Sequence, residues 1–180
     1  MKIISNFVDG KLTNVKPSGF IPLFKPTTGE EYAHVPITTQ LEFEEIIRKM
    51  KFAQKSWAET AITKRSNILF KFKSLIEKDF DNIAKIISEE HGKVFSDAKG
   101  SLQRGLEVVD FACGIPHLLK GNHSINVGTN VDSYDIRQSL GICAGITPFN
   151  FPAMVPMWMF PLSIACGNAF MLKPSEKVPQ

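Results

Sequence analysis

The side chains best suited to chemistry in this sequence follow two short apolar segments in its last quarter. Asn150 comes shortly after residues 141–146, and Lys173 and Glu176 follow residues 169–172. A side-chain amide donates hydrogen bonds without a protonation requirement, so Asn150 can stabilise negative charge that develops on an oxygen atom. A carboxylate after a strand can accept hydrogen bonds from both hydroxyls of an adenosine ribose, and a neighbouring lysine can donate to the same ribose.

Each candidate also has a simpler explanation. Asparagine is common in loops after strands, where its side chain caps the backbone. Lys173 and Glu176 can form an ion pair in a solvated turn without binding anything. Spacing alone leaves both explanations open.

The segments that carry these residues are predicted to form a βαβ unit. Gly141–Ile146 (GICAGI) predicts a short buried strand, an apolar helix follows, and Ala169–Leu172 predicts a second buried strand. The crossover between two such strands is almost always right-handed, and ligands of such sheets bind outside the carboxyl ends of the strands. All three candidate residues are therefore expected at the binding edge of the sheet.

This region is also long and apolar enough to raise the question of a membrane. No charged residue stands between Arg137 and Lys173, and about 20 apolar residues can span a bilayer. Pro156 and Pro161 would each remove a helical hydrogen bond, and no aromatic belt or basic flank frames the run. A buried α/β core explains the same composition, so no membrane contact is predicted.

The rest of the chain predicts small strands and helices. Asp9-Gly10 indicates a hairpin within 6–12, and 32–37 is expected to be extended. Thr39 and Glu42 have the spacing of a capping box. They are expected to open the first of four helices; the second contains Arg65, the third ends near Gly92 and the fourth covers about 96–118. Residues 122–138 predict a hairpin or extended excursion.

The fold class is thus α/β. A parallel sheet of two strands is not a viable domain alone, so these residues are expected to be the front part of a longer protein.

Composition narrows the class of protein. The 180 residues contain 43% hydrophobic and 22% charged side chains with a net charge of +3, and lysine and arginine form no run, so nucleic acid binding is not predicted. Three cysteines at spacings unlike any metal or redox motif, without a secretory signal, predict a reducing, cytoplasmic location. His117 and His123 have no carboxylate or cysteine at ligand spacing, so no metal site is predicted.

Several motifs together resemble the aldehyde dehydrogenase superfamily. GITPFNFP (145–152) is similar to its N-terminal signature, and AMVPMWMFP (153–161) and CGNAFMLKPSE (166–176) look like its CoA-acylating methylmalonate-semialdehyde dehydrogenase branch. Weaker similarities occur at 25–30, 90–93 and 104–112. This branch often has Ala, Arg and Thr at the positions of Thr147, Lys177 and Val94, respectively. None of these departures removes a catalytic group.

The resemblance implies a reaction and a place for this chain in it. The family oxidises aldehydes with NAD through a cysteine thiohemiacetal, hydride transfer and a thioester. In this branch coenzyme A takes the acyl group, giving propionyl-CoA or acetyl-CoA from methylmalonate or malonate semialdehyde. The chain would be the N-terminal portion of a Rossmann-like NAD-binding domain, with 122–138 used in a homodimer or homotetramer. The nucleophilic cysteine and the general-base glutamate would come from a catalytic domain that this chain does not contain.

The resemblance also assigns roles to individual residues. Asn150 would stabilise the oxyanion, and Arg104 would bind the carboxylate of the aldehyde substrate, for which a bidentate guanidinium is an apt partner. The residues implied at the cofactor are Thr147, Phe149, Lys173, Glu176 and Lys177. Phe149 can instead belong to the core, and Arg104 can instead be a surface residue.

Two other functions stay open at this point. The chain can belong to a hydrolytic aldehyde dehydrogenase with another class of substrate, or it can be a truncated module that folds or assembles without catalysis. In each case the 180 residues alone are expected not to oxidise aldehydes, because Cys113, Cys143 and Cys166 are all assigned to apolar core or helix positions.

Overall fold

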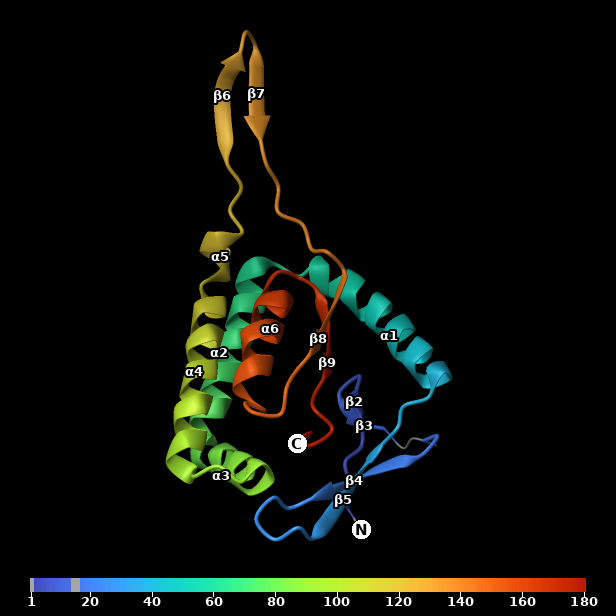
Figure 1. Cartoon of the computed structure of the whole chain (residues 1–180). Helices are drawn as coiled ribbons and strands as arrows, with labels where there is room; N and C mark the ends of the chain where they lie inside the picture. Colours follow the sequence, from blue (N-terminus) through green and yellow to red (C-terminus); the bar gives the residue numbers. More distant parts are fainter. Residues whose placement is uncertain (1, 14–16) are drawn as a thin grey trace.

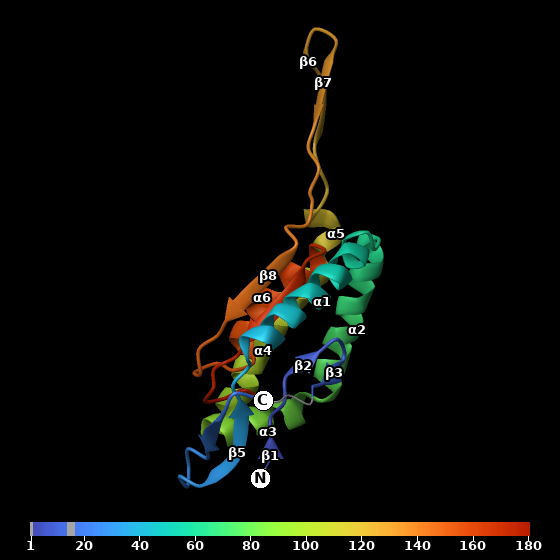
Figure 2. The same ribbon diagram turned by 90° about the vertical axis from the view of Figure 1, so that its right-hand side faces the viewer.

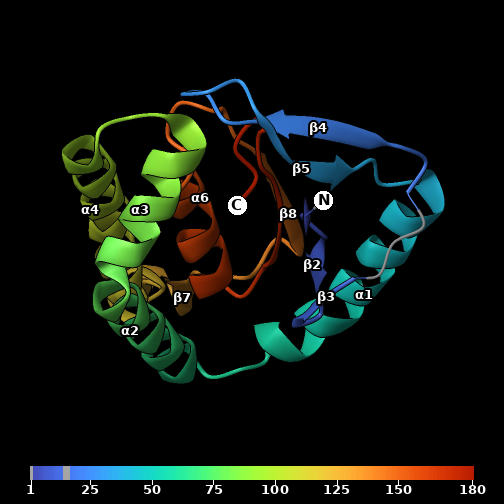
Figure 3. The same cartoon turned by 90° about the horizontal axis from the view of Figure 1, so that it is seen from below.

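The computed structural model describes residues 2–13 and 17–180, in a mixed helix and strand architecture. Its centre is the βαβ unit of β8 (Ile142–Ile146), α6 (Met154–Ala165) and β9 (Ala169–Lys173). The helix α1 (Gln40–Ala58) lies along one side of the two strands, and α6 covers the other side (Figure 3). Behind α6 pack α2 (Ile62–Lys78) and α4 (Phe95–Cys113), so most of the core lies between helices.

The βαβ unit confirms the geometry predicted from the sequence. Its strands are parallel, and Ile146 stands opposite Lys173 in the register, so both strands end at the same edge. The Thr147 N–H donates to the Lys173 carbonyl at 3.1 Å and extends the pairing by one residue. At the opposite end, the buried Asn168 side chain accepts hydrogen bonds from the N–H groups of Leu140 and Gly141 and fixes the start of β8.

Local sequence signals set the limits of the first two helices. The predicted capping box is present: Thr39 Oγ1 accepts from the Glu42 N–H at 3.3 Å, and the Glu42 carboxylate accepts from the Thr39 N–H at 3.2 Å. The buried Arg65 guanidinium of α2 donates to the carbonyls of Trp57, Ala58 and Thr60. It thereby satisfies backbone oxygens that the end of α1 leaves without helical partners.

The next two helices supply most of the core. The helix α3 (Phe80–His91) ends at Gly92, whose φ of 83° is the left-handed conformation predicted for this C-cap. Each residue of the close-spaced stripe predicted for α4 is buried: Leu102, Gly105, Leu106, Val109, Ala112 and Cys113. At Gly105 the helix approaches α6 so closely that an added Cβ would lie 2.7 Å from the sulfur of Met157.

The fourth predicted helix is divided into two. The α-helix ends at Cys113, and a short helix, α5 (Ile115–Leu118), begins after Gly114. The prediction of one helix over 96–118 was therefore wrong at its end. Pro116 lies in the first turn of α5, where its missing N–H costs nothing. The apolar spacing of the sequence continues across Gly114, although the helix is interrupted there.

Two other groups of strands lie outside this body. The first is a small sheet of β1 (Lys2–Ile3), β5 (Glu31–Pro36) and β4 (Phe20–Phe24), beside the hairpin of β2 (Phe7–Val8) and β3 (Lys11–Leu12). The second is the hairpin of β6 (His123–Gly128) and β7 (Val131–Tyr134), which projects far from the rest of the chain (Figures 1 and 2). Both predicted hairpins are confirmed.

Burial differs from the sequence prediction at three elements, β8, β9 and α1. The strands β8 and β9 are only partly buried, with Ile146 at 79% and Leu172 at 38% exposure, and Cys143 is likewise only partly buried. Within the described residues these strands pair only with each other, so their side chains lack further covering elements. The apolar stripe of α1 is present in the sequence, but α1 has no fully buried residue. No helix among the described residues is long and apolar enough to cross a membrane.

Candidate active site

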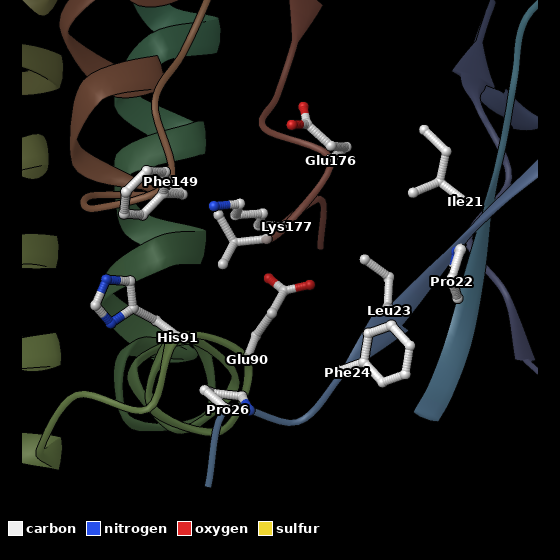
Figure 4. A pocket seen from close by; sticks show the side chains of 11 residues that line it. Ile21, Pro22, Leu23, Phe24, Pro26, Glu90, His91, Phe149, Glu176 and Lys177 are labelled. Atoms are coloured by element: carbon white, nitrogen blue, oxygen red, sulfur yellow. The ribbon is translucent and has the colours of Figure 1, made fainter. Parts of the chain in front are cut away.

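The loop between β8 and α6 contributes residues to two pockets. We name the first the apolar pocket; it has a volume of about 560 Å³ and lies between strand β4, the end of α3 and the segment after β9 (Figure 4). Phe149 lines it, together with the apolar side chains of β4, such as Leu23 and Phe24. Glu90, Glu176 and Lys177 bring charge to an otherwise apolar wall.

The second pocket, which we name the polar pocket, is lined by other residues of the same loop. Its volume is about 480 Å³, and its walls carry charged and polar groups. The residues that line it are His91, Lys93, Ser96, Asp97, Gly100, Arg104, Asn150 and Phe151. Phe149 thus lines one pocket and Asn150 the other, although they are adjacent in the sequence.

The structure brings Asn150 and Arg104 together in the polar pocket. Arg104 is exposed on α4, and its guanidinium carbon lies 5.6 Å from the centre of the Phe151 ring, so the ring and the cation attract each other. Because Asn150 and Phe151 are neighbours, this contact places the guanidinium near the loop that carries the amide. A molecule in this pocket can therefore meet both the amide and the guanidinium.

The residues predicted at the cofactor gather at the end of β9. Lys173 Nζ lies 2.9 Å from Glu176 Oε2, and both side chains are about half exposed. The backbone N–H of Glu176, together with the Lys173 ammonium, holds the pKa of the Glu176 carboxyl below its ordinary value. This carboxylate is consequently charged near neutral pH and open to a ligand with hydroxyl groups.

Phe149 and Lys177 are in contact near this ion pair, whereas Thr147 is joined to the end of β9 through its backbone. Lys177 Nζ is 4.7 Å from the centre of the Phe149 ring, a cation–π contact between two residues that line the apolar pocket (Figure 4). Phe149 is half exposed, so it is not a core residue within this chain. Thr147 is buried, with 5% exposure, and its backbone joins β8 to the end of β9.

Three further residues at these pockets were not predicted from the sequence. Lys93 Nζ donates to the main-chain oxygen of Asn150 at 2.8 Å. Glu90 is buried, and its carboxylate accepts hydrogen bonds from the Tyr32 hydroxyl and the Gln180 N–H. His91 lines both pockets. Glu90, His91 and Lys93 stood in the sequence only as the weak similarity at 90–93.

Burial makes Cys113 and Cys166 poor candidates for a nucleophile. All three are free thiols, and burial raises the pKa of Cys113 and of Cys166. A thiol with a raised pKa forms little of the reactive thiolate. Cys143 is partly buried within β8, and none of the three lines either pocket. Among the described residues, no group of three or more His, Cys, Asp or Glu side chains is placed to hold a metal ion.

Comparison with known proteins settles the family. The model of the aldehyde dehydrogenase family matches residues 14–180. The chain belongs to this family. Its architecture is accordingly the N-terminal part of an aldehyde dehydrogenase fold, and the resemblance read from the motifs is confirmed.

Similar sequences narrow the branch within the aldehyde dehydrogenases. The chain is 46% identical over 176 residues to the acylating methylmalonate-semialdehyde dehydrogenase of Arabidopsis thaliana, covering 98% of this chain and 29% of that protein. It is 50% identical over 157 residues to the malonate-semialdehyde dehydrogenase of Pseudomonas aeruginosa, covering 87% of this chain and 32% of that protein. The chain spans about a third of the length of these curated relatives.

Solved structures agree with this branch. The methylmalonate-semialdehyde dehydrogenase of Oceanimonas doudoroffii superposes with a TM-score of 0.97 at 46% identity, over 100% of this chain and 37% of that one. A Sinorhizobium meliloti protein assigned as a methylmalonate-semialdehyde dehydrogenase, crystallised with NAD, superposes with a TM-score of 0.96 at 44% identity. That match covers 99% of this chain and 36% of the other.

Proposed function

We propose that this chain is the N-terminal part of an enzyme that oxidises methylmalonate or malonate semialdehyde with NAD and coenzyme A. The products are propionyl-CoA or acetyl-CoA, NADH and carbon dioxide. The observation that carries the proposal is the division of one loop between two pockets, with Phe149 beside Glu176 and Lys177, and Asn150 beside Arg104. Similarity to semialdehyde dehydrogenases supports the substrate class.

The residues of the apolar pocket fit NAD. The exposed, ionised Glu176 carboxylate offers acceptors for two ribose hydroxyls, and Lys173 offers a donor beside it. A carboxylate at this place also repels a 2′-phosphate, which favours NAD over NADP. Phe149 and Lys177 would lie along the cofactor, and Thr147 would support it from below. When bound, NAD supplies the hydride acceptor of the reaction.

The residues of the polar pocket fit the aldehyde. The Asn150 amide would donate to the carbonyl oxygen, where negative charge grows when a thiolate adds to the carbon. Arg104 would pair with the carboxylate at the other end of the substrate. The thiolate would come from outside these 180 residues, since the three cysteines of this chain do not line the pocket.

Coenzyme A distinguishes this proposal from a hydrolytic aldehyde dehydrogenase. We use "full-length enzyme" for the product of the complete coding sequence, which we expect to have the length of the relatives. With methylmalonate semialdehyde, it should reduce NAD only when coenzyme A is present and should release propionyl-CoA, detected by mass spectrometry. NAD reduction without coenzyme A, with a free acid as the product, would favour the hydrolytic enzyme.

The same assay tests the alternative of a non-catalytic module. The purified 180-residue chain should not reduce NAD with this substrate, because it lacks an activated thiol at the pocket. Turnover that disappears in Cys143→Ala would contradict this expectation. If the complete coding sequence itself yields a protein of 20.1 kDa, a folding or assembly module becomes the better description.

For the assembly we propose a homodimer or homotetramer built through the β6–β7 hairpin, and for the compartment the reducing cytoplasm.

A further inference from the structure

We propose that Lys93 is a positioning residue that holds the Asn150 amide in place through the main-chain oxygen of Asn150. The role of Asn150 in oxyanion stabilisation belongs to the proposed function, and the catalytic part of this inference rests on it. The contact between Lys93 and the loop stands independently, so it can be tested without turnover.

The backbone of Lys93 is fixed to α3. The residue follows Gly92, the left-handed C-cap, whose N–H donates to the Ser88 carbonyl at 2.8 Å. The Ser88 hydroxyl then donates to the Lys93 carbonyl at 2.6 Å. These two bonds tie the turn back onto the last turn of the helix. The lysine side chain consequently leaves the helix end from a well-defined point.

The side chain of Lys93 makes two contacts with consecutive residues of the loop. Its ammonium group donates to the Asn150 carbonyl at 2.8 Å and lies 4.5 Å from the centre of the Phe151 ring. The first is a charge-assisted hydrogen bond and the second a cation–π contact, and each limits a different movement of the loop. Since the bond uses the main-chain oxygen, both hydrogens of the Asn150 side-chain amide stay available to a substrate.

The two cations of the polar pocket therefore have different tasks. Arg104 also faces the Phe151 ring, but the structure gives its guanidinium no hydrogen bond among the described residues. Lys93 is committed to the loop, whereas Arg104 is available to an anion. Burial and the charge of Arg104 lower the pKa of Lys93, and Asp97 opposes this shift. Because Lys93 contacts the loop and not the substrate carboxylate, its loss should affect charged and uncharged aldehydes alike.

The first test uses the full-length enzyme and nuclear magnetic resonance. The side-chain amide resonances of Asn150 are identified by their disappearance in Asn150→Ala. In Lys93→Met they should shift and broaden, whereas in Lys93→Arg, which retains a donor and a cation, they should stay near the parent positions. The matched control is Lys99→Met, because Lys99 pairs with Asp81 at 2.7 Å and faces the Phe80 and Phe95 rings but lines neither pocket. Unchanged Asn150 resonances in Lys93→Met, or equal changes in Lys99→Met, would overturn the proposal.

The second test is a double-mutant cycle in the full-length enzyme. A displacement of about 1 Å in a catalytic group can reduce the rate about a hundredfold, so Lys93→Met should lower kcat by roughly 10- to 100-fold, for propanal as well as for methylmalonate semialdehyde. Lys93→Arg should restore much of the rate. If Lys93 acts through Asn150, the double variant Lys93→Met/Asn150→Ala should be no slower than Asn150→Ala alone.

The outcomes separate this inference from the proposed function. Additive losses in the cycle, or a raised KM for the semialdehyde alone, would overturn the positioning role and make Lys93 a substrate-binding residue. A full-length enzyme that does not oxidise semialdehydes would contradict the proposed function, and the resonance measurement would still decide whether Lys93 holds the loop. Should Lys93→Met fail to fold, the same measurement on Lys93→Gln, a neutral residue with a shorter reach, replaces it; unaltered resonances there would equally overturn the proposal.

Discussion

The apolar and polar pockets share His91 and one loop, yet they differ in almost every other property. The apolar pocket has strand β4 as a wall and acidic groups at its edge, and its cation, Lys177, lies against Phe149. In the polar pocket the wall is α4, and two cations face the Phe151 ring. Adjacent residues of one loop, Phe149 and Asn150, thus line two different chemical environments.

This difference explains how one short motif can serve two ligands. An exposed carboxylate suits the hydroxyls of a ribose and disfavours an added phosphate, whereas the Arg104 guanidinium suits a carboxylate. The Glu176 carboxylate would repel a substrate carboxylate, whereas the neutral hydroxyls of a ribose would form no ion pair with Arg104. Substitutions in each pocket test whether the two ligands are divided in this way, and the largest effect is expected at Asn150.

Removal of the Asn150 amide should have the greatest effect on the rate. In the full-length enzyme, Asn150→Ala should lower kcat by roughly a hundredfold or more, because the lost donor acts mainly on charge in the transition state. The dissociation constant of NAD should change little, since Asn150 does not line the apolar pocket. Steady-state kinetics and an NAD titration measure both quantities. Asn82→Ala, which removes an exposed amide of α3, is the control, and an unchanged kcat in Asn150→Ala would remove Asn150 from the mechanism.

Arg104 tests whether the polar pocket recognises a carboxylate. The Arg104→Leu variant should lose roughly 10- to 100-fold in kcat/KM for methylmalonate semialdehyde, through loss of a charge-assisted hydrogen bond. Propanal, which has no carboxylate, should be affected little or turned over faster. Arg48→Leu removes an exposed arginine of α1 and should be neutral for both substrates. Equal losses on both substrates would show that Arg104 has a structural role.

Glu176 tests the identity of the other ligand. The Glu176→Gln variant should bind NAD more weakly and discriminate less against NADP, because a neutral amide no longer repels a 2′-phosphate. The ratio of kcat/KM for the two cofactors measures this change. Glu89→Gln, at another exposed glutamate paired with a lysine, should leave the ratio alone. If Glu176→Gln keeps the parental preference, another residue determines the cofactor.

The Glu90→Gln substitution tests how the free energy of unfolding depends on pH, and its effect is expected to be the smallest of these. Burial raises the pKa of its carboxyl above the ordinary value of 4.5, although the bonds from Gln180 and Tyr32 oppose the shift. The folded state therefore binds the proton more tightly than the unfolded state, and this stabilisation is complete below pH 4.5 and lost as pH rises through the raised pKa. Relative to Glu90→Gln, the parent chain should become less stable as pH increases across that window.

Urea unfolding of the full-length enzyme at several pH values measures this difference. The gap, defined as the free energy of unfolding of the parent minus that of Glu90→Gln, should fall from pH 4 towards pH 7, and the exposed Glu89→Gln should show no such trend. A gap that stays constant with pH would mean that the Glu90 carboxyl titrates alike in the folded and unfolded chain.

Local signals allowed much of the fold to be predicted from the sequence. The capping box at Thr39, the left-handed turn at Gly92 and the two hairpins depend on residues close together in the chain, and all four are present. The parallel register also follows from the βαβ order, which places Ile146 and Lys173 at one edge. The break at Gly114 was missed because the apolar spacing continues through it.

The candidate site was only partly predictable, because its pockets depend on packing between distant segments. Asn150, Lys173 and Glu176 were found because they follow strands, and Arg104 through the family resemblance. Lys93 lies 57 residues before Asn150, and Glu90 lies 90 residues before Gln180. No periodicity or spacing in the sequence indicates such contacts. They arise when α3 packs against α4 and when the chain after β9 returns to α3.

The division of the two pockets can be tested most directly by a crystal structure of the full-length enzyme with NAD and malonate, a dicarboxylate that it cannot oxidise. The adenosine ribose should hydrogen-bond to Glu176, and a malonate carboxylate should lie within hydrogen-bonding distance of Arg104, on the Asn150 side of the loop. A ribose bound away from Glu176, or malonate bound beside Phe149 rather than Asn150, would contradict the account.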